Sequence, residues 1–491
     1  MKPGGKWSKV PLVLAVLALV AALPAVSSAK APAARAGRLD PAFGKDGKAV
    51  TVLPAEESTR EYVDYALPFE FAPGRVVMAA AGGDRVVVAN GKAIVEYLAN
   101  GQRNPRFGGN GAVPVAAVEG SRFQLADIAV DSQGRVLIAG TTRPKTRLGM
   151  AGLPLPGPIP SMATIVRYQP NGQLDRSFGS EGVVNTDLGV QPPTFEGRAY
   201  PGSAVAVVGL LVDRSDRPIL TGSAVSEVGR CAVSQNRYEA SRAIVARRTS
   251  SGAADSTFAE NGLKSVGGIS WLGSPAFTST AIVSTGANVD PCPQGGPDDP
   301  SVLASFGSDG ALDASFDADG FWSRPFTRIS SLAVAPSGKL VLLARTIELS
   351  HGKWIESAGE AERLLANGSF DASFGHGGRA SLDLPKRGAV SAVAADAKDR
   401  VLLVGQVWSK SRRKPRRNPL RSNLLLMRMT KAGELDRDFG RRGRVTTGFG
   451  NKTKLRATDV LLDRGRIVVG AKIVGPKIRN GFALARYLGG R

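Results

Sequence analysis

The chain is poor in the residues from which most active sites are built. It has two histidines and two cysteines in 491 residues, and no zinc cluster or cysteine–histidine pair can be assembled from them. No Gly-x-Ser-x-Gly follows a strand and opens a helix, so a nucleophile elbow is unsupported. Glycine-rich stretches such as AAGGD at 80–84 fall in hairpin turns, without the following helix that a phosphate loop requires. We therefore assign no catalytic residue, no metal ligand and no cofactor.

Long apolar runs are also missing, with one exception at the start. The run at 10–26 follows Lys2, Lys6 and Lys9 and precedes the small residues of 27–29. This order is typical of a secretory signal peptide, which we end after Ala29; an uncleaved membrane anchor is the alternative. No other run approaches the roughly 20 residues of a membrane-spanning helix. We expect a signal peptide at 1–29, a short linker at 30–37, and a protein that is secreted or held at the cell envelope, with no transmembrane span.

Acidic residues are too few to balance the basic ones. The chain has 64 Lys and Arg against 42 Asp and Glu, a formal net charge of +22, and +19 remains without the three lysines of 1–29. An exported protein of this charge should be drawn to polyanions. The alternative is a basic surface that binds nothing in particular.

Helix-period patterns are absent beyond the first 29 residues, and one motif recurs instead. It reads LDRSFGSEGVV at 174–184, and its phenylalanines are spaced by 64, 71, 80, 58, 58 and 65 residues. A period of about sixty residues indicates an array of one supersecondary unit. The seven motif phenylalanines are Phe43, Phe107, Phe178, Phe258, Phe316, Phe374 and Phe439.

Each unit contains four strand-like segments, as at 123–130, 135–140, 163–168 and 183–186. Asn-Gly and Asp-Gly pairs between alternating apolar residues are strong hairpin signals. Seven such units predict an all-β fold, a seven-bladed β-propeller of four-stranded antiparallel blades over 38–491. The chain begins with a fourth strand and stops after a third, so the N-terminal strand should complete the last blade and leave no open edge. We expect a monomer.

The pattern LDxxFGxxGxV, followed by an A-x-A-V-x-x-x-G-R-V-L-L-x-G hairpin, resembles the delta-60 repeat family of bacterial exported β-propellers, which is similar to NHL-repeat propellers. The resemblance covers 38–491 and implies the propeller fold without a uniform activity. The fourth unit departs from the pattern, because TSTAIVSTGANVD at 278–290 lacks a clean second hairpin strand. The regularity of that blade is therefore open.

The motif itself is interpreted as architecture. Its leucine and phenylalanine should fill the gap between neighbouring blades, and its glycines should supply positive φ. Its aspartate should accept backbone N–H groups in an Asx turn, with Asn104 in that role in one unit. These aspartates are Asp40, Asp175, Asp255, Asp313, Asp371 and Asp436. Calcium binding by them, or by the acidic stretch 287–300, is the less favoured alternative.

Two of the four connections in each unit vary in length, and they should share one end of the propeller. Binding residues usually lie in such loops. Cys231 and Cys292 lie in the second-to-third-strand connections of neighbouring blades, so we predict one disulfide between them. The segment SKSRRKPRRNPLR at 409–421 is the densest run of basic residues in the chain. Trp408 directly precedes it, and Trp354 lies in the corresponding loop of the adjacent blade. The basic residues of the segment are Lys410, Arg412, Arg413, Lys414, Arg416, Arg417 and Arg421.

These residues predict a site where arginine forks meet phosphate or carboxylate oxygens and tryptophans offer an apolar platform. A solvated loop is the alternative. The sequence thus favours a binding or scaffolding module for an anionic polysaccharide, another envelope polymer or a surface protein, and no specific nucleic acid. A polysaccharide hydrolase or lyase with carboxylates at the propeller mouth is the competing class, and we favour the binding role over it.

Overall fold

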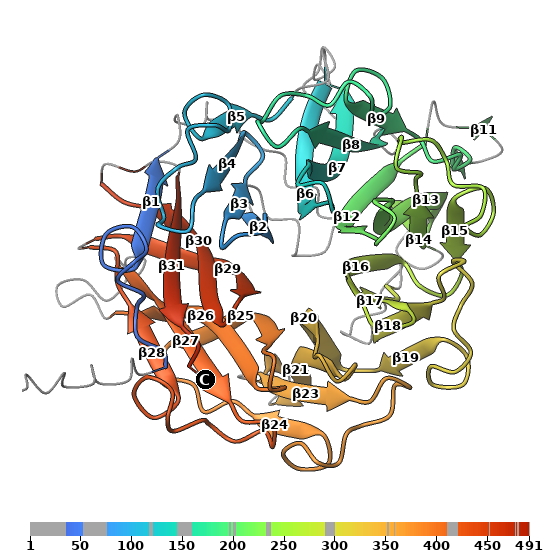
Figure 1. Ribbon diagram of the computed structural model, residues 1–491. Coiled ribbons are helices and arrows are strands. Elements are labelled where there is room, and N and C mark those ends of the chain that lie inside the picture. The colour runs from blue at the N-terminus through green and yellow to red at the C-terminus, as the bar shows by residue number, and fades with distance from the viewer. Residues whose placement is uncertain are drawn as a thin grey trace, which may run out of the picture. The chain divides into compact units, whose positions relative to one another are not determined.

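The computed structural model describes residues 36–52, 76–116, 121–144, 160–195, 198–199, 203–231, 237–289, 300–350, 353–357, 359–409, 421–450, 452–476, 478 and 481–490. Within these residues all regular structure is β, and seven four-stranded antiparallel sheets stand in a ring (Figure 1). The predicted seven-bladed propeller is confirmed. Among the described residues, none forms a helix that is long and apolar enough to cross a membrane.

The blades follow one another along the chain, each with its first strand innermost. Blade I has β2 (Val77–Ala80), β3 (Val86–Ala89), β4 (Ala93–Tyr97) and β5 (Ala112–Pro114). Blade II has β6 (Ser121–Val130), β7 (Val136–Pro144), β8 (Met162–Tyr168) and β9 (Val183–Thr186). Blade III has β12 (Val205–Val212), β13 (Pro218–Arg230), β14 (Arg237–Arg247) and β15 (Leu263–Val266).

The remaining four blades repeat this order. Blade IV has β16 (Trp271–Phe277), β17 (Ile282–Ala287), β18 (Ser301–Phe306) and β19 (Phe321–Arg324). Blade V has β20 (Thr327–Val334), β21 (Leu340–Ser350), β23 (Glu360–Leu364) and β24 (Arg379–Ser381), with β22 (Lys353–Glu356) paired to β21. Blade VI has β25 (Gly388–Ala395), β26 (Val401–Trp408), β27 (Ser422–Met429) and β28 (Arg444–Thr447). Blade VII has β29 (Lys454–Asp463), β30 (Arg466–Val474), β31 (Gly481–Leu488) and β1 (Lys48–Val52).

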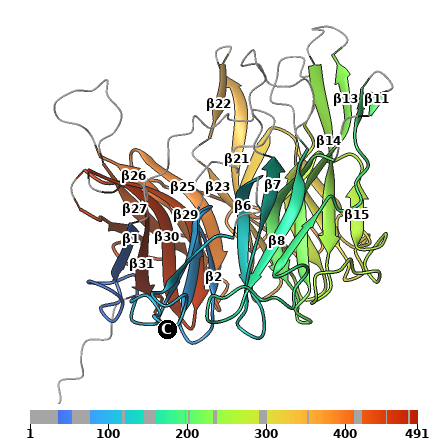
Figure 2. The same cartoon turned by 90° about the horizontal axis from the view of Figure 1, so that it is seen from above.

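The two ends of the ring differ. Antiparallel pairing places the short first-to-second and third-to-fourth strand turns at one end, here named the turn end, and the other connections at the loop end. Figure 2 shows the hairpins of β13–β14 and β21–β22 rising on the loop end. A small hairpin of β10 (Thr194–Phe195) and β11 (Arg198–Ala199) lies between blades II and III in the chain. Blade IV has all four strands, with an irregular register between Leu272 and Pro275.

The ring closes as predicted. β1 pairs with β31 from Lys48 opposite Ala485 to Val52 opposite Gly481, so the first strand of the chain is the outermost strand of the last blade. Closure joins segments more than 400 residues apart and removes the free edge that an open array would present.

The core lies between the blades. Seven apolar clusters fill the seven interfaces, each built from two neighbouring blades around one motif phenylalanine. All seven of these phenylalanines are fully buried, which confirms their predicted role. The motif leucines contribute less: Leu39, Leu312 and Leu435 are only partly buried, and Leu174 is 38% exposed. The leucines therefore cover the edge of the gap that the phenylalanines fill.

A backbone hydrogen bond accompanies each phenylalanine. The residue that follows it donates its N–H to a carbonyl in the segment that leads into the fourth strand of the next blade, as in Gly179 to Ser251 at 2.8 Å. The other six are Gly44 to Asn100, Gly108 to Asn171, Ala259 to Asp309, Asp317 to Asn367, Gly375 to Ala432 and Gly440 to Ala36. The donor has positive φ, and at Gly44 a Cβ would lie 2.1 Å from the carbonyl oxygen of Lys48. Glycine is therefore preferred at this step of the motif.

Phe178→Ala should lower the free energy of unfolding by about 3–5 kcal/mol, because it opens a cavity between blades II and III. Urea denaturation measures the loss. Phe277→Ala removes a side chain that is 38% exposed and is the matched control. Equal losses in the two variants would show that the interface phenylalanines do not dominate the packing of the ring.

Candidate functional site

The motif aspartate lies at the turn end and binds two kinds of partner. Its Oδ1 accepts the N–H of the residue two positions on, as from Ser177 to Asp175 at 3.2 Å. The same bond forms at Asp40, Asp255, Asp313, Asp371, Asp436 and, through its amide oxygen, Asn104. The predicted Asx turn is thus confirmed in every blade.

The second carboxylate oxygen holds an arginine that the sequence analysis did not identify. In blade II, Arg167 of β8 donates its Nε to Asp175 at 2.7 Å and lies over the ring of Phe178 at 4.3 Å. Its Nη1 donates to the carbonyl of Ser250 in blade III at 2.5 Å. The same arginine, aspartate and phenylalanine set recurs with Arg247, Arg363, Arg428 and Arg486. In four of the five units the arginine stands eight residues before the aspartate, and this constant spacing in the sequence could have identified it.

Two blades depart from this set, and each departure is compensated. In blade I the strand residue is Glu96, and the motif aspartate is replaced by Asn104, whose Nδ2 donates to Glu96 at 2.6 Å. Arg85 supplies the positive charge of this set and forms a 2.8 Å ion pair with Glu96. The carboxylate therefore lies on the third strand, where other blades have the arginine. In blade IV the strand residue is Ser305, and its hydroxyl donates to Asp313 at 3.2 Å. In every blade, the side chain on the third strand and the side chain at the aspartate position of the motif are therefore able to form a hydrogen bond or an ion pair with each other.

Hydrogen bonds and neighbouring charges lower the pKa of several motif aspartates. Burial alone would raise the pKa of Asp175, but hydrogen bonds from Ser177 and the positive charge of Arg167 outweigh it, so the pKa is lowered. Asp255 and Asp371 have lowered pKa values by the same balance. Glu362 differs, because burial raises its pKa although Arg324 and Arg379 lie beside it.

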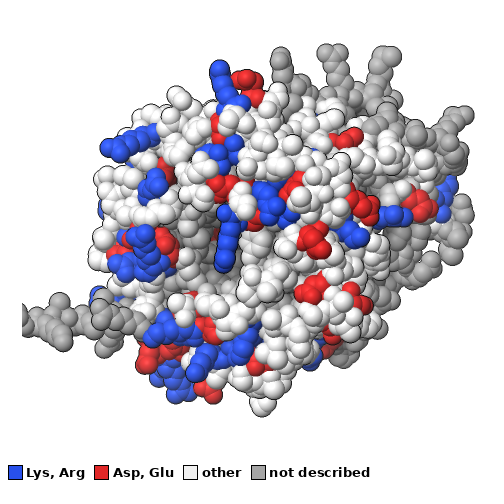
Figure 3. All heavy atoms as spheres, turned by 45° about the vertical axis from the view of Figure 1, so that its right-hand side comes forward, with Lys and Arg blue, Asp and Glu red and all other residues white. Residues whose placement is uncertain are grey.

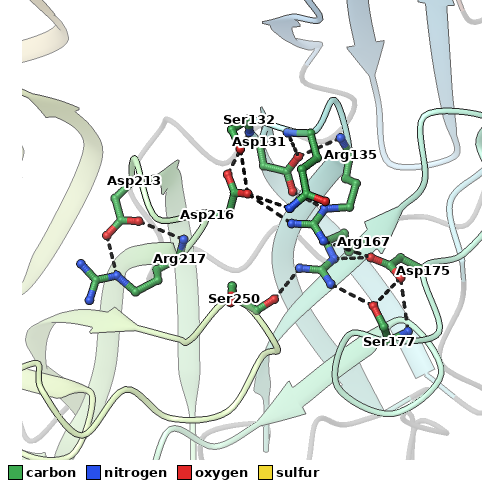
Figure 4. A network of polar contacts seen from close by, with 11 residues as sticks. Asp131, Ser132, Arg135, Arg167, Asp175, Ser177, Asp213, Asp216, Arg217 and Ser250 are labelled. Atoms are coloured by element: carbon green, nitrogen blue, oxygen red, sulfur yellow. Dashed lines mark hydrogen bonds and ion pairs between the residues drawn. The ribbon is translucent and has the colours of Figure 1, made fainter.

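Blades II and III enclose a polar cleft at this end (Figure 4). Its volume is about 330 Å³. It is lined by Gln133, Arg135, Arg167, Ser177, Ser215, Asp216, Ser250 and Ser251. Asp216 reaches from blade III to blade II and accepts from the N–H and the hydroxyl of Ser132 at 2.8 and 2.9 Å. Burial would raise the pKa of Asp216, but these bonds outweigh it and the pKa is lowered. Figure 3 shows a surface on which basic and acidic side chains are interspersed around a hollow.

The described ends of the predicted basic segment, Ser409 and Arg421, lie at the opposite, loop end. Trp408 ends β26 beside Ser422, the first residue of β27, and its N–H donates to the carbonyl of Arg387. Ser409 and Arg421 are joined by a backbone hydrogen bond of 3.1 Å, so the segment leaves and re-enters blade VI at one point. Lys410, Arg412, Arg413, Lys414, Arg416 and Arg417 lie outside the described residues. Trp354 lies in β22 of blade V, where its backbone pairs with Leu349.

The first strand of blade VII adds cations that the sequence analysis did not single out. Lys454 and Arg456 are exposed on β29, while Leu455 and Ala457 between them are buried against blade VI. Lys472 of β30 pairs with Arg456 across the sheet. These three cations, here named the basic wall, face blade I.

Within the described residues, β2 of blade I begins too low to cover Lys454 and Arg456 of the basic wall. The N–H of Met78, the second residue of β2, donates to Asp459 at 3.0 Å and fixes the height at which the two blades meet. β29 begins five residues before Asp459, so its first part extends beyond the start of β2. Lys92, in the turn between β3 and β4, is exposed at the loop end of blade I.

The surplus of positive charge is concentrated in this part of the chain. Residues 386–491 carry 27 Lys and Arg and seven Asp and Glu, a net charge of +20 out of the +22 of the whole sequence. These residues form blade VI and the first three strands of blade VII. An evenly basic surface would have spread the surplus over all seven blades.

The predicted disulfide stays a prediction. Cys231 directly follows β13 and is buried, and Cys292 lies outside the described residues. Within the described ranges, no group of three or more His, Cys, Asp or Glu side chains gathers as metal ligands would.

Comparisons with known proteins give structural similarity alone. No family model and no curated protein matches the chain. Among solved structures it is similar to the polysaccharide lyase Uly1, with 10% identity over 88% of this chain and 94% of that one, at a TM-score of 0.46. A Penicillium chrysogenum α-L-arabinanase complexed with arabinobiose has 11% identity over 75% and 94%, at 0.36. A Trypanosoma rangeli sialidase in complex with sialic acid has 12% over 92% and 60%, at 0.39. At these identities and scores they carry no argument about ligand or activity.

The exchange of charge in blade I predicts strong coupling between two positions. Glu96→Arg alone should destabilise the fold, because it places a buried cation beside Arg85 with no carboxylate. Asn104→Asp alone should destabilise it by setting two carboxylates together. The double variant restores the set found in blade II and should recover stability. A double-mutant cycle by urea denaturation should give a coupling energy of about 1–3 kcal/mol; additive losses would contradict the pairing.

The lowered aspartate pKa values predict acid sensitivity. A carboxyl whose pKa is depressed in the folded state contributes stability that is fully present above its unfolded pKa, about 3.9, and is lost as the pH falls through the folded value. The contribution of these aspartates to the free energy of unfolding should therefore be flat between about pH 5 and 7 and fall below about pH 4. Asp175→Asn should make this fall shallower in urea titrations at each pH. A stability that is unchanged at pH 2 would contradict the assignment.

Proposed function

We propose that this chain is an exported binding module that captures an anionic polymer of the cell envelope at the loop end of blades VI and VII. The observation that carries the proposal is the concentration of charge: 20 of the 22 surplus positive charges lie in residues 386–491. At the loop end they include the basic wall and the segment 409–421, here named the basic loop. A polyanion binds such a surface by long-range attraction and by local hydrogen bonds.

The arrangement of the patch supports an extended ligand. Trp408 and Arg387 lie side by side at the edge of blade VI, and the hydroxyl of Ser422 donates to the carbonyl of Leu455 in blade VII at 2.8 Å. Blade VI thus abuts the strand that carries the basic wall, so the base of the basic loop and the wall belong to neighbouring blades. A polymer that follows this edge would meet cations from both blades in succession.

Binding to the purified cell-envelope fraction, and to beads that carry polygalacturonate, should weaken as NaCl is raised, because salt screens exposed charges. One variant changes Arg412, Arg413, Arg416 and Arg417 to Ser, and a second changes Lys454, Arg456 and Lys472 to Ser. Each should bind at least about tenfold more weakly than the parent, a change of about 1.4 kcal/mol.

The matched control changes Arg103, Arg106, Arg176 and Arg214 to Ser, which removes four exposed cations from the turn end of blades I, II and III. It should bind as the parent does. An equal loss in the control would show that net charge, and not this surface, determines binding. If the polymer is shortened during incubation, with new reducing ends or unsaturated products, the hydrolase or lyase alternative is correct instead.

A further inference from the structure

We infer that the cleft between blades II and III at the turn end is a binding site for a neutral saccharide, one or two sugar rings in size. This inference stands apart from polymer capture at the loop end, because it concerns the opposite end of the ring and a ligand without charge. The volume of about 330 Å³ is at the lower end of the range for small-molecule sites.

The charges that line the cleft argue against an ionic ligand. Arg135, Arg167 and Asp216 line the cleft, and the buried carboxylates of Asp131 and Asp175 lie behind the two arginines and form ion pairs with them. Three negative charges thus lie within ion-pair reach of two positive ones. An anion entering the cleft would have to compete with three carboxylates for the two guanidinium groups, and a cation would meet these guanidinium groups at the cleft wall. A neutral group that both donates and accepts hydrogen bonds meets neither cost, and sugar hydroxyls are such groups.

The arginines retain hydrogen-bonding capacity toward the cleft. Arg135 is held firmly through Nε, at 2.6 Å from Asp131, but its Nη2 lies 3.4 Å from Asp216 and its Nη1 lies 3.8 Å from Asp175. The Nη2 of Arg167 is 3.4 Å from the hydroxyl of Ser177. These outer nitrogens make long bonds, so a hydroxyl oxygen at the usual 2.7–3.2 Å would improve on their present partners.

The rim of the cleft is polar and small. Gln133, Ser215 and Ser251 are exposed on two facing walls, and Figure 4 shows Arg135, Arg167 and Asp216 converging between blades II and III. The interface between blades V and VI has a similar bond, in which Asp399 accepts the N–H of Ser337, but Ala335 and Lys339 take the places of Asp131 and Arg135 there. There the positions of Ser215, Ser250 and Ser251 carry Lys398, Lys431 and Ala432. At the cleft between blades II and III, serines stand at the positions of these two lysines. The cleft therefore has more space and two fewer positive charges.

Saturation-transfer NMR on the purified protein with D-glucose, D-galactose and maltose tests the inference. At least one of these sugars should bind with a Kd of about 1 mM, the range of weak specific ligands, and raising the salt should not displace it. Ser251→Trp should fill the cleft from blade III and weaken binding about tenfold or more. Gln133→Trp should do the same from blade II.

Ala432→Trp is the matched control, because it adds the same side chain at the equivalent turn position of blade VI. It should leave sugar binding unchanged. The inference is overturned if none of the three sugars binds at millimolar concentration, or if both cleft variants bind as the parent does. It is also overturned if inorganic phosphate displaces the sugar, which would mark the cleft as an anion site.

Discussion

The ring depends on the contact that each motif phenylalanine makes with the following blade. The side chain fills the gap between two sheets, and the next residue hydrogen-bonds to the turn of the neighbouring blade. In five blades an arginine lies over the same ring and is tied to the motif aspartate. The arginine is nearly buried, so its charge is tolerable only because the aspartate pairs with it and a carbonyl of the next blade accepts a hydrogen bond from its Nη1, as Ser250 does from Arg167. Apolar packing and an ion pair therefore act at the same place in five of the seven interfaces. In the other two, Glu96 with Asn104 and Ser305 with Asp313 take the places of the arginine and the aspartate.

This arrangement divides the molecule into an end that is committed to structure and an end that is free to vary. At the turn end, the first-to-second and third-to-fourth strand turns take part in the interface bonds, so their length and sequence are constrained. The seven interface bonds described above all lie at the turn end, and at the loop end hairpins such as β21–β22 extend beyond the ring. The cleft between blades II and III is an exception at the turn end, since it arises where serines replace longer side chains around an intact ion-pair frame.

The repeat made most of the fold predictable. The spacing of Phe43 to Phe439, the Asx role of the aspartates and the closure by residues 48–52 follow from a motif that can be aligned with itself. Arg167 and its equivalents were within reach of the same comparison. The basic wall was not, because the exposure of Lys454 and Arg456 depends on how far β2 falls short of β29, and that height is set by the bond between Met78 and Asp459. The cleft depends likewise on how two blades meet, which no single repeat contains.

The shortness of blade I and the basicity of blade VII are linked by the cost of desolvation. If β2 began as far toward the loop end as β29 does, it would cover Lys454 and Arg456 and remove two cations from water with no described acid beside them. Burying such charges without partners is strongly unfavourable. Lys454 and Arg456 on β29 therefore require one of three conditions. The neighbouring strand begins farther from the loop end and leaves them in water, acidic side chains pair with them, or an external anion binds the basic wall. Because an external anion brings its own negative charge, it can cover the wall where an apolar strand cannot. Among the described residues, the step between blades VII and I therefore leaves Lys454 and Arg456 exposed, where the proposed polyanion would pair with them.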